Sequence, residues 1–99
     1  MDRSTYKQLV QEVDWSQYPG MLGPDFPVAE QLLAVASEEE DVAGQAMGQL
    51  LEHTCNQDVL EPAAAEVARW LLRLTEIDEP IHRWIPLVGL EQFLGAVDR

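Results

Sequence analysis

The amino-acid sequence predicts an all-α fold, a compact bundle of five or six helices with short connections. Apolar residues recur every three or four positions along most of the chain, which is the spacing of one helix face. No stretch alternates apolar and polar residues as a half-buried strand would, and no two-residue hairpin signal is present. With 99 residues, of which 46 % are hydrophobic, we expect a single helical domain over residues 1–99 with a packed core.

The first helix is expected over about residues 4–14, where apolar side chains follow helical spacing. The next segment, WSQYPGMLGPDFP, contains two Pro/Gly turn signals that exclude a helix. Two interpretations stay open for this aromatic loop. It folds back over the core, or it offers Tyr18 and Phe26 as exposed anchors, since aromatic residues are enriched in binding hot spots. Trp15 is predicted to be at least partly accessible.

Pro27 suits the first turn of a second helix that ends near Ala36, because its missing N–H has no helical partner there. Ser37 and Glu40 have the spacing of a capping box, which predicts a third helix over about residues 39–54. The run of carboxylates at this point is interpreted as a helix start. A calcium loop would need alternating oxygen ligands and a central glycine, which are missing.

Two glycines, Gly44 and Gly48, lie four residues apart on this third helix and therefore on one face. Each lowers the intrinsic helix preference by ~1 kcal/mol relative to alanine. Close approach by a neighbouring helix, or by a partner, would compensate for that loss.

The densest group of reactive side chains lies in the stretch HTCNQDVLE, from His53 to Glu61. Local structural roles are expected. His53 falls in the last turn of a helix, where a ring N–H can meet free carbonyls, and Asn56 suits the left-handed position that ends the helix. Asp58 forms a capping box with Glu61. His53 and Cys55 project ~200° apart on a helix, so they cannot readily pair as base and nucleophile. One Cys and two His give no zinc spacing. We therefore expect that the protein is not an enzyme and that it binds no metal or cofactor. The disfavoured alternative is an enzyme that uses His53, Asp58 and Glu61.

The fourth helix, over about residues 59–75, is the most apolar and is expected at the centre of the bundle. Pro86 is expected to divide the last region into a short turn and a helix over about residues 87–97. Trp70 and Trp84 are both predicted to lie in the core. In the last region inward positions are predicted for Ile81, Trp84, Ile85, Val88, Leu90, Phe93, Leu94 and Val97.

Acidic residues are concentrated in the middle of the chain, which carries a net charge of −12. All six Lys and Arg residues lie within residues 1–7 or 69–99, so residues 8–68 hold twelve acids and no Lys or Arg. Nucleic acid and anionic membranes are disfavoured as partners, because their phosphates attract Lys and Arg. A basic protein is the expected partner, although acidity that only keeps a small protein soluble is an alternative.

The start of the sequence lacks the continuous apolar stretch of a signal peptide, and no apolar run reaches the ~18 residues of a membrane span. A single Cys excludes a disulfide within the chain. We therefore expect a cytoplasmic protein that is a monomer when free.

The stretch VAEQLLAVASEEEDVAGQAMGQLLEHTCNQDVLEPAAAEVARWLLRLTE, about half of the chain, resembles the repeat unit of bacterial HEAT-like helical proteins. The shared features are Leu pairs near helix ends, short acidic or polar turns, and alanine-rich helices. They lie at residues 32–33, 37–41, 43–51, 53–57 and 63–72. The resemblance implies antiparallel helix pairs. Small bacterial proteins of this type are similar to immunity proteins, which neutralise a toxin made by the same genome and carry no catalytic set.

The leading functional hypothesis is an immunity or inhibitor protein that binds a basic surface of a partner such as a toxin enzyme. Carboxylates would steer the partner, and a few aromatic side chains would supply the desolvated anchor. Glu40 is expected to be less available, because the capping box occupies it. The residues predicted to bind the partner are Glu30, Glu38, Glu39, Asp41, Glu52, Tyr18 and Phe26. The alternative is a helical adaptor or secretion chaperone that holds a partner in an apolar groove.

Overall fold

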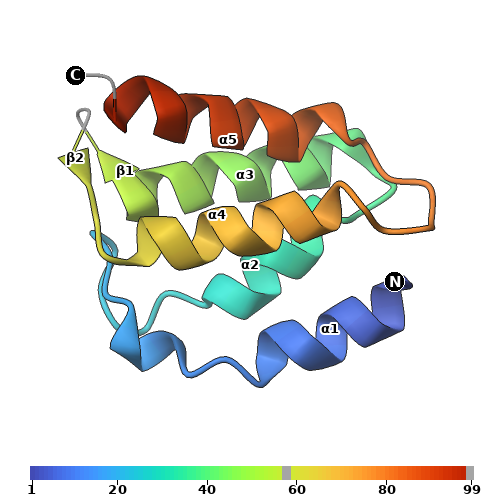
Figure 1. Cartoon of the computed structure of the whole chain (residues 1–99), viewed down its shortest axis with the longest axis horizontal. Coiled ribbons are helices and arrows are strands. Elements are labelled where there is room, and N and C mark those ends of the chain that lie inside the picture. Colours follow the sequence, from blue (N-terminus) through green and yellow to red (C-terminus); the bar gives the residue numbers. More distant parts are fainter. Residues whose placement is uncertain (57–58, 98–99) are drawn as a thin grey trace.

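A computed structural model describes residues 1–56 and 59–97 of the chain. Within these residues the backbone forms five α-helices, one short 3-10 helix and one two-stranded hairpin. The elements are α1 (Arg3–Gln11), η1 (Trp15–Gln17), α2 (Val28–Val35), α3 (Glu40–Thr54), β1 (Cys55–Asn56), β2 (Val59–Leu60), α4 (Ala63–Leu74) and α5 (Trp84–Val97). The predicted all-α fold is confirmed (Figure 1).

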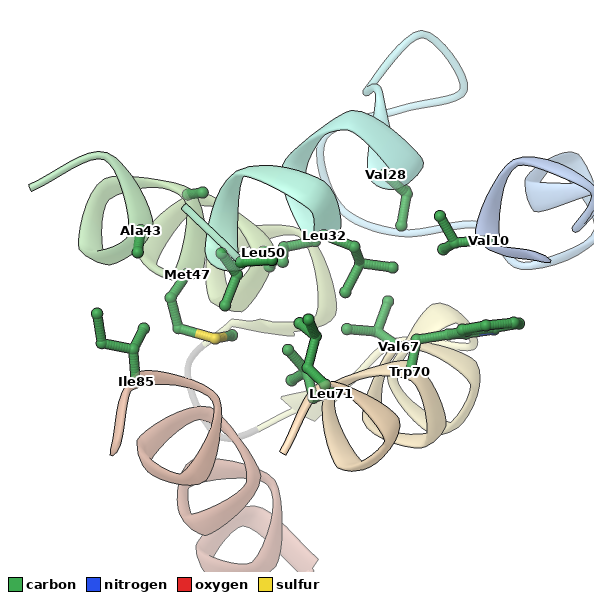
Figure 2. Close-up of a cluster of buried hydrophobic side chains, with 14 of the residues drawn as sticks. Val10, Val28, Leu32, Ala43, Met47, Leu50, Val67, Trp70, Leu71 and Ile85 are labelled. Atoms are coloured by element: carbon green, nitrogen blue, oxygen red, sulfur yellow. The ribbon is translucent and has the colours of Figure 1, made fainter. Parts of the chain in front are cut away.

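Consecutive helices run in opposite directions and pack as two antiparallel pairs (Figure 1). α2 and α3 form one pair, α4 and α5 form the other, and α1 packs beside α2. Figure 2 shows the two pairs facing each other, with Leu32 and Leu50 of one pair pointing toward Val67 and Leu71 of the other. All four side chains are fully buried, and burying one such side chain contributes ~1.5–3 kcal/mol relative to exposing it.

The amino-terminal helix joins the bundle through an aromatic contact with α4. The rings of Tyr6 and Trp70 meet edge to face with their centroids 5.7 Å apart, and the Tyr6 hydroxyl donates a hydrogen bond to the Trp70 carbonyl at 2.9 Å. Burial raises the pKa of the Tyr6 hydroxyl, so it keeps the proton that it donates. Arg3 adds an ion pair with Glu79 at 3.3 Å.

The predicted capping box at the start of α3 is wrong. The Ser37 hydroxyl accepts a hydrogen bond from the Glu39 N–H at 3.1 Å, and α3 begins at Glu40 without a side-chain cap. A serine hydroxyl that bonds the backbone two residues on favours a turn over a helix start. Glu40 is exposed in the first turn, so no capping box withholds its carboxylate from a partner.

The connection between α3 and α4 also differs from its prediction. Asn56 does not take a left-handed capping position but lies in β1, where it pairs with Val59 of β2. The Thr54 hydroxyl donates to the Leu50 carbonyl at 2.7 Å, and after it the chain leaves the helix in an extended conformation. Residues 59–62 therefore precede α4, whereas the sequence placed them within the helix. The proposed cap Asp58 lies outside the described residues.

In α5, Pro86 stands in the first turn rather than before the helix. A proline is tolerated there because that turn's N–H groups have no helical partner. Ile85 and Phe93 are buried as predicted, and Ile81 and Leu90 are partly buried. The inward prediction is wrong for Trp84, Val88 and Leu94, which are 53 %, 40 % and 67 % exposed. The Val97 side chain lies outside the described part of the chain.

A close approach at Gly89 explains why α5 turns this way. A Cβ atom at Gly89 would lie 2.6 Å from the Met47 methyl carbon and 3.4 Å from a Leu71 methyl carbon. The positions on the same face as Gly89 thereby face α3 and α4, and Trp84 points away from the core. Trp70, by contrast, is only 4 % exposed, and Trp15 is partly exposed, so the predictions for these two residues are confirmed.

Candidate partner-binding surface

The five carboxylates predicted to bind a partner are all exposed. They are Glu30 in the first turn of α2, Glu38 and Glu39 between α2 and α3, and Asp41 and Glu52 on α3. Among the described residues, none of the five forms an ion pair with a base. Their charges are therefore not neutralised at short range by the part of the chain that the structure describes.

These carboxylates do not form one continuous cluster. Glu38, Glu39 and Asp41 lie together at the α2–α3 connection, with Glu40 between them. Glu52 lies eleven positions after Asp41, which corresponds to ~16 Å along a helix. The acidic surface therefore has a compact part at the start of α3 and two separate carboxylates, Glu52 near the end of α3 and Glu30 in the first turn of α2.

The two predicted aromatic anchors, Tyr18 and Phe26, are half-buried against the core. Phe26 stacks on the His53 ring with centroids 4.5 Å apart, and Tyr18 meets Trp15 edge to face at 6.0 Å. The loop that carries them covers the end of α3, near Glu52 and not near Glu38. Its exposed apolar side chains are Met21 and Leu22, at 56 % and 43 %, which the sequence analysis did not select.

His53 holds this loop in place. Its carbonyl accepts a hydrogen bond from the Met21 N–H at 2.9 Å, and its Nδ1 accepts one from the Leu22 N–H at 3.2 Å. The ring is buried, with 2 % exposure. Burial lowers the pKa of His53, and the Glu61 carboxylate opposes that shift in part. The neutral imidazole that results is the form that accepts the Leu22 hydrogen bond.

This geometry supports a structural role for His53 rather than a chemical one. Its Nδ1 is already hydrogen-bonded to the backbone, and Phe26 covers one face of the ring. Within the described residues, no three His, Cys, Asp or Glu side chains come close enough together to hold a metal ion. Asp58, which the alternative enzyme hypothesis requires, lies outside those residues.

An apolar groove between α3 and α5 was missed by the sequence analysis. Its volume is about 290 Å³, and it is lined by Gly44, Met47, Gly48 and Leu51 of α3 and by Trp84, Ile85 and Val88 of α5. Met47 and Ile85 are buried beneath it, whereas Trp84 and Val88 are exposed. The glycine pair was the available signal. Trp84 was placed in the core because α5 is apolar on all sides, so its periodicity could not select a face.

The buried imidazole predicts a specific pH dependence of stability. Because the pKa of His53 is lowered in the folded state, the unfolded chain binds a proton first as the pH falls through about 6.5. Stability is therefore fully present above that pH and is lost below it, until the folded-state pKa is also passed. Urea unfolding followed by circular dichroism between pH 7.5 and 5.5 should show this loss.

Two variants identify the group responsible. His53→Gln removes the titrating ring and should flatten the dependence in this range. His82→Gln removes the other histidine, whose Nε2 lies 2.7 Å from the Glu38 carbonyl oxygen, and should leave the dependence in place. A wild-type unfolding midpoint that does not change from pH 7.5 to 5.5 would contradict the structural assignment of His53.

Among residues 1–56 and 59–97, no helix combines the length and the apolar composition that crossing a membrane requires. Comparisons of the chain with protein-family models, with curated protein sequences and with solved structures gave no match. A functional assignment for this chain therefore rests on its own residues and geometry.

Proposed function

We propose that this protein is a non-catalytic binding module for a basic protein, and that it acts as an immunity or inhibitor protein against a toxin enzyme. The observation that carries the proposal is the charge distribution: twelve acids and no Lys or Arg between Gln8 and Ala68. An excess of exposed carboxylates creates a negative potential that accelerates the approach of a cationic surface.

The structure supports this proposal through the accessibility of the charges. Glu38, Glu39, Glu40 and Asp41 are consecutive and exposed where α3 begins. A partner can reach all four without rearrangement of the helices. An exposed ion pair contributes only ~0–1 kcal/mol, so these residues are expected to act together and mainly on the association rate.

The neutralisation of a toxin is the finer part of the proposal, and it rests on the resemblance to HEAT-like immunity proteins. The antiparallel pairs α2–α3 and α4–α5 agree with the helix pairs that this resemblance implies. Such a protein would block its target by covering a basic cleft with carboxylates. Co-expression with the captured partner provides the cellular test, because an immunity protein should restore growth that the partner alone prevents.

Reversing three charges together tests the acidic surface. The partner is first captured at low ionic strength from the source cells and purified. Changing Glu38, Glu39 and Asp41 to Lys is then expected to slow association by ~10-fold or more and to reduce its salt dependence. Dissociation should change little. Association and dissociation rates measured at two ionic strengths separate these effects.

A matched control reverses three exposed acids elsewhere, Glu12, Asp25 and Glu76, with the same change in net charge. This variant should associate faster than the first one, because it leaves the run of four carboxylates at the start of α3 intact. Circular dichroism verifies that both variants are folded. An association rate that neither the first triple reversal nor added salt changes would show that the acidic surface serves solubility alone.

The groove between α3 and α5 favours a second function, that of a helical adaptor or secretion chaperone. Its seven lining residues contain no charged side chain, and an apolar contact of this kind is not screened by salt. A partner held there should remain bound at high ionic strength and should be lost when the groove is filled. Capture of partners at both low and high salt distinguishes this function from the first.

A further inference from the structure

The surface of the groove between α3 and α5 has the features of a binding site for part of another protein. Trp84 forms one wall and is 53 % exposed. An exposed Trp is typical of binding surfaces, because Trp is among the residues most enriched at binding hot spots. Val88 continues the wall one turn later and is 40 % exposed. Met47 and Ile85, whose side chains lie between α3 and α5 in Figure 2, close the groove from below.

The opposite wall is formed by two glycines that the fold itself does not require. A Cβ atom at Gly44 or Gly48 would meet no atom within 4 Å. Neither glycine therefore serves a close contact within the described structure, in contrast to Gly89. Each nevertheless costs the exposed helix ~1 kcal/mol relative to alanine. Their absent side chains leave this stretch of α3 open, so that a partner can approach the helix backbone.

Three exposed carboxylates lie about one helical turn from residues that line the groove. On α3, Asp41 precedes Gly44 by three residues and Glu52 follows Gly48 by four, so both lie about one turn away on neighbouring positions. On α5, Glu91 follows Val88 by three residues and is exposed. The nearest base in sequence, Arg83, donates hydrogen bonds to the carbonyls of Thr75, Ile77 and Glu79. Its guanidinium is thus directed to the α4–α5 connection.

We infer that this groove binds one face of an amphipathic helix of the basic partner, with apolar side chains between Trp84 and Gly48 and with Lys or Arg side chains on the surrounding carboxylates. The groove extends over residues 44–51 of α3, which is ~10 Å or two helical turns. An amphipathic helix supplies apolar side chains at this spacing with cations beside them. The inference rests on the proposed function, because it takes the basic character of the partner from it.

Charge selects this occupant over a second copy of the chain. Two copies would bring together molecules that each carry a net charge of −12, and the like charges around the groove would repel each other. A second apolar hollow, of about 370 Å³, lies between the start of α4 and Phe93. Its lining includes the Glu61 carboxylate, but its one aromatic residue, Phe93, is only 6 % exposed, so it lacks an exposed aromatic wall such as the one that Trp84 supplies.

The test uses two synthetic peptides of identical composition and charge, and it does not depend on the natural partner. One peptide has Leu at helical spacing on one face and Lys or Arg elsewhere, and the other has the same residues in scrambled order. Both peptides carry a fluorescent label, and neither peptide contains Trp. The amphipathic peptide should bind the full-length protein ~10-fold or more tightly than the scrambled peptide in fluorescence anisotropy. The Trp84 indole N–H signal in an NMR titration should shift with the amphipathic peptide.

Variants then locate the site. Gly48→Leu fills the groove at a position with open space. It should lower the affinity for the amphipathic peptide by ~10-fold or more, to the affinity for the scrambled peptide. Trp84→Ala should have a similar effect. The control Gln8→Leu adds the same apolar side chain at an exposed position of α1, on the other side of the bundle from α5 (Figure 1), and should leave affinity within about twofold of wild type.

The possible failures are distinguishable. Equal binding of both peptides, released by salt and unaffected by Gly48→Leu, would retain the acidic binding module and overturn the groove as its site. If Gly48→Leu weakens binding but added salt does not change it, the groove binds its partner without charge attraction. That result would contradict a basic partner and therefore the amphipathic basic helix as the occupant. A dimer of the free protein in sedimentation experiments that Gly48→Leu dissociates would identify a second copy as the occupant and overturn the inference.

Discussion

Trp70→Ala is expected to lower the free energy of unfolding by ~3–5 kcal/mol, as for other buried aromatic residues replaced by alanine. Trp70 is 4 % exposed, packs edge to face on Tyr6, and lies beneath the Arg73 guanidinium at 4.6 Å. Its indole N–H donates to Glu66 at 3.1 Å. The truncation leaves a cavity between α1 and α4 and removes all of these contacts. Because a domain has only ~5–15 kcal/mol of stability, much of the protein should unfold.

Trp84→Ala is the matched comparison. Trp84 is 53 % exposed at the start of α5, so its truncation should cost less than ~1 kcal/mol. Urea unfolding of both variants, followed by far-ultraviolet circular dichroism, measures the difference directly. Equal losses of stability would show that Trp84 belongs to the core, as its sequence environment had predicted, and would remove one wall of the groove.

Gly20→Ala is the second substitution with a large expected effect, a loss of ~1–3 kcal/mol or more from overpacking. An added Cβ would collide with the His53 ring and with the His53 carbonyl oxygen. The backbone oxygen cannot move without disturbing the end of α3, where it accepts the Met21 N–H. The loop would therefore have to lift from His53, which would expose Phe26 and the imidazole to water.

The same substitution at Gly48 should have the opposite sign. No atom lies within 4 Å of a Cβ at Gly48, so Gly48→Ala should gain up to ~1 kcal/mol from helix propensity alone. Thermal or urea unfolding of the two variants measures both effects in one experiment. Should Gly20→Ala be as stable as wild type, the contact between the loop and His53 would be misplaced, and the pH dependence assigned to His53 would lose its basis.

Helical spacing of apolar residues was sufficient to predict the helices themselves. Leu32, Leu50, Val67 and Leu71 are buried because each lies on the apolar face of its own helix. The spacing that produces such a face can be recognised in a short window of sequence. The ends of the helices were less predictable. α4 begins at Ala63 and not at residue 59 as predicted, because the backbone pairing between β1 and β2 competes with the helix. That pairing depends on two segments at once.

The candidate site could be predicted only in part. That Glu38, Glu39 and Asp41 are exposed follows from the cost of burying an unpaired charge, which is a property of the residue. That Phe26 is engaged by His53, and that a groove opens beside Gly48, depends on how separate elements meet. In α5, where apolar residues occur on every side, the sequence contained no preference for the face that became buried.

By itself, the sequence determined the all-α class, the approximate position of each helix and the separation of acidic and basic residues along the chain, since each follows from residues near one another. Only the tertiary structure decided which tryptophan is buried and which glycines are closely approached by another segment of the chain. A Cβ at Gly20 would collide with the His53 backbone and one at Gly89 with the end of the Met47 side chain, whereas Gly44 and Gly48 are open, although all four are the same residue. The physical reason is that burial and close approach are properties of two surfaces, and the second surface comes from a distant part of the chain.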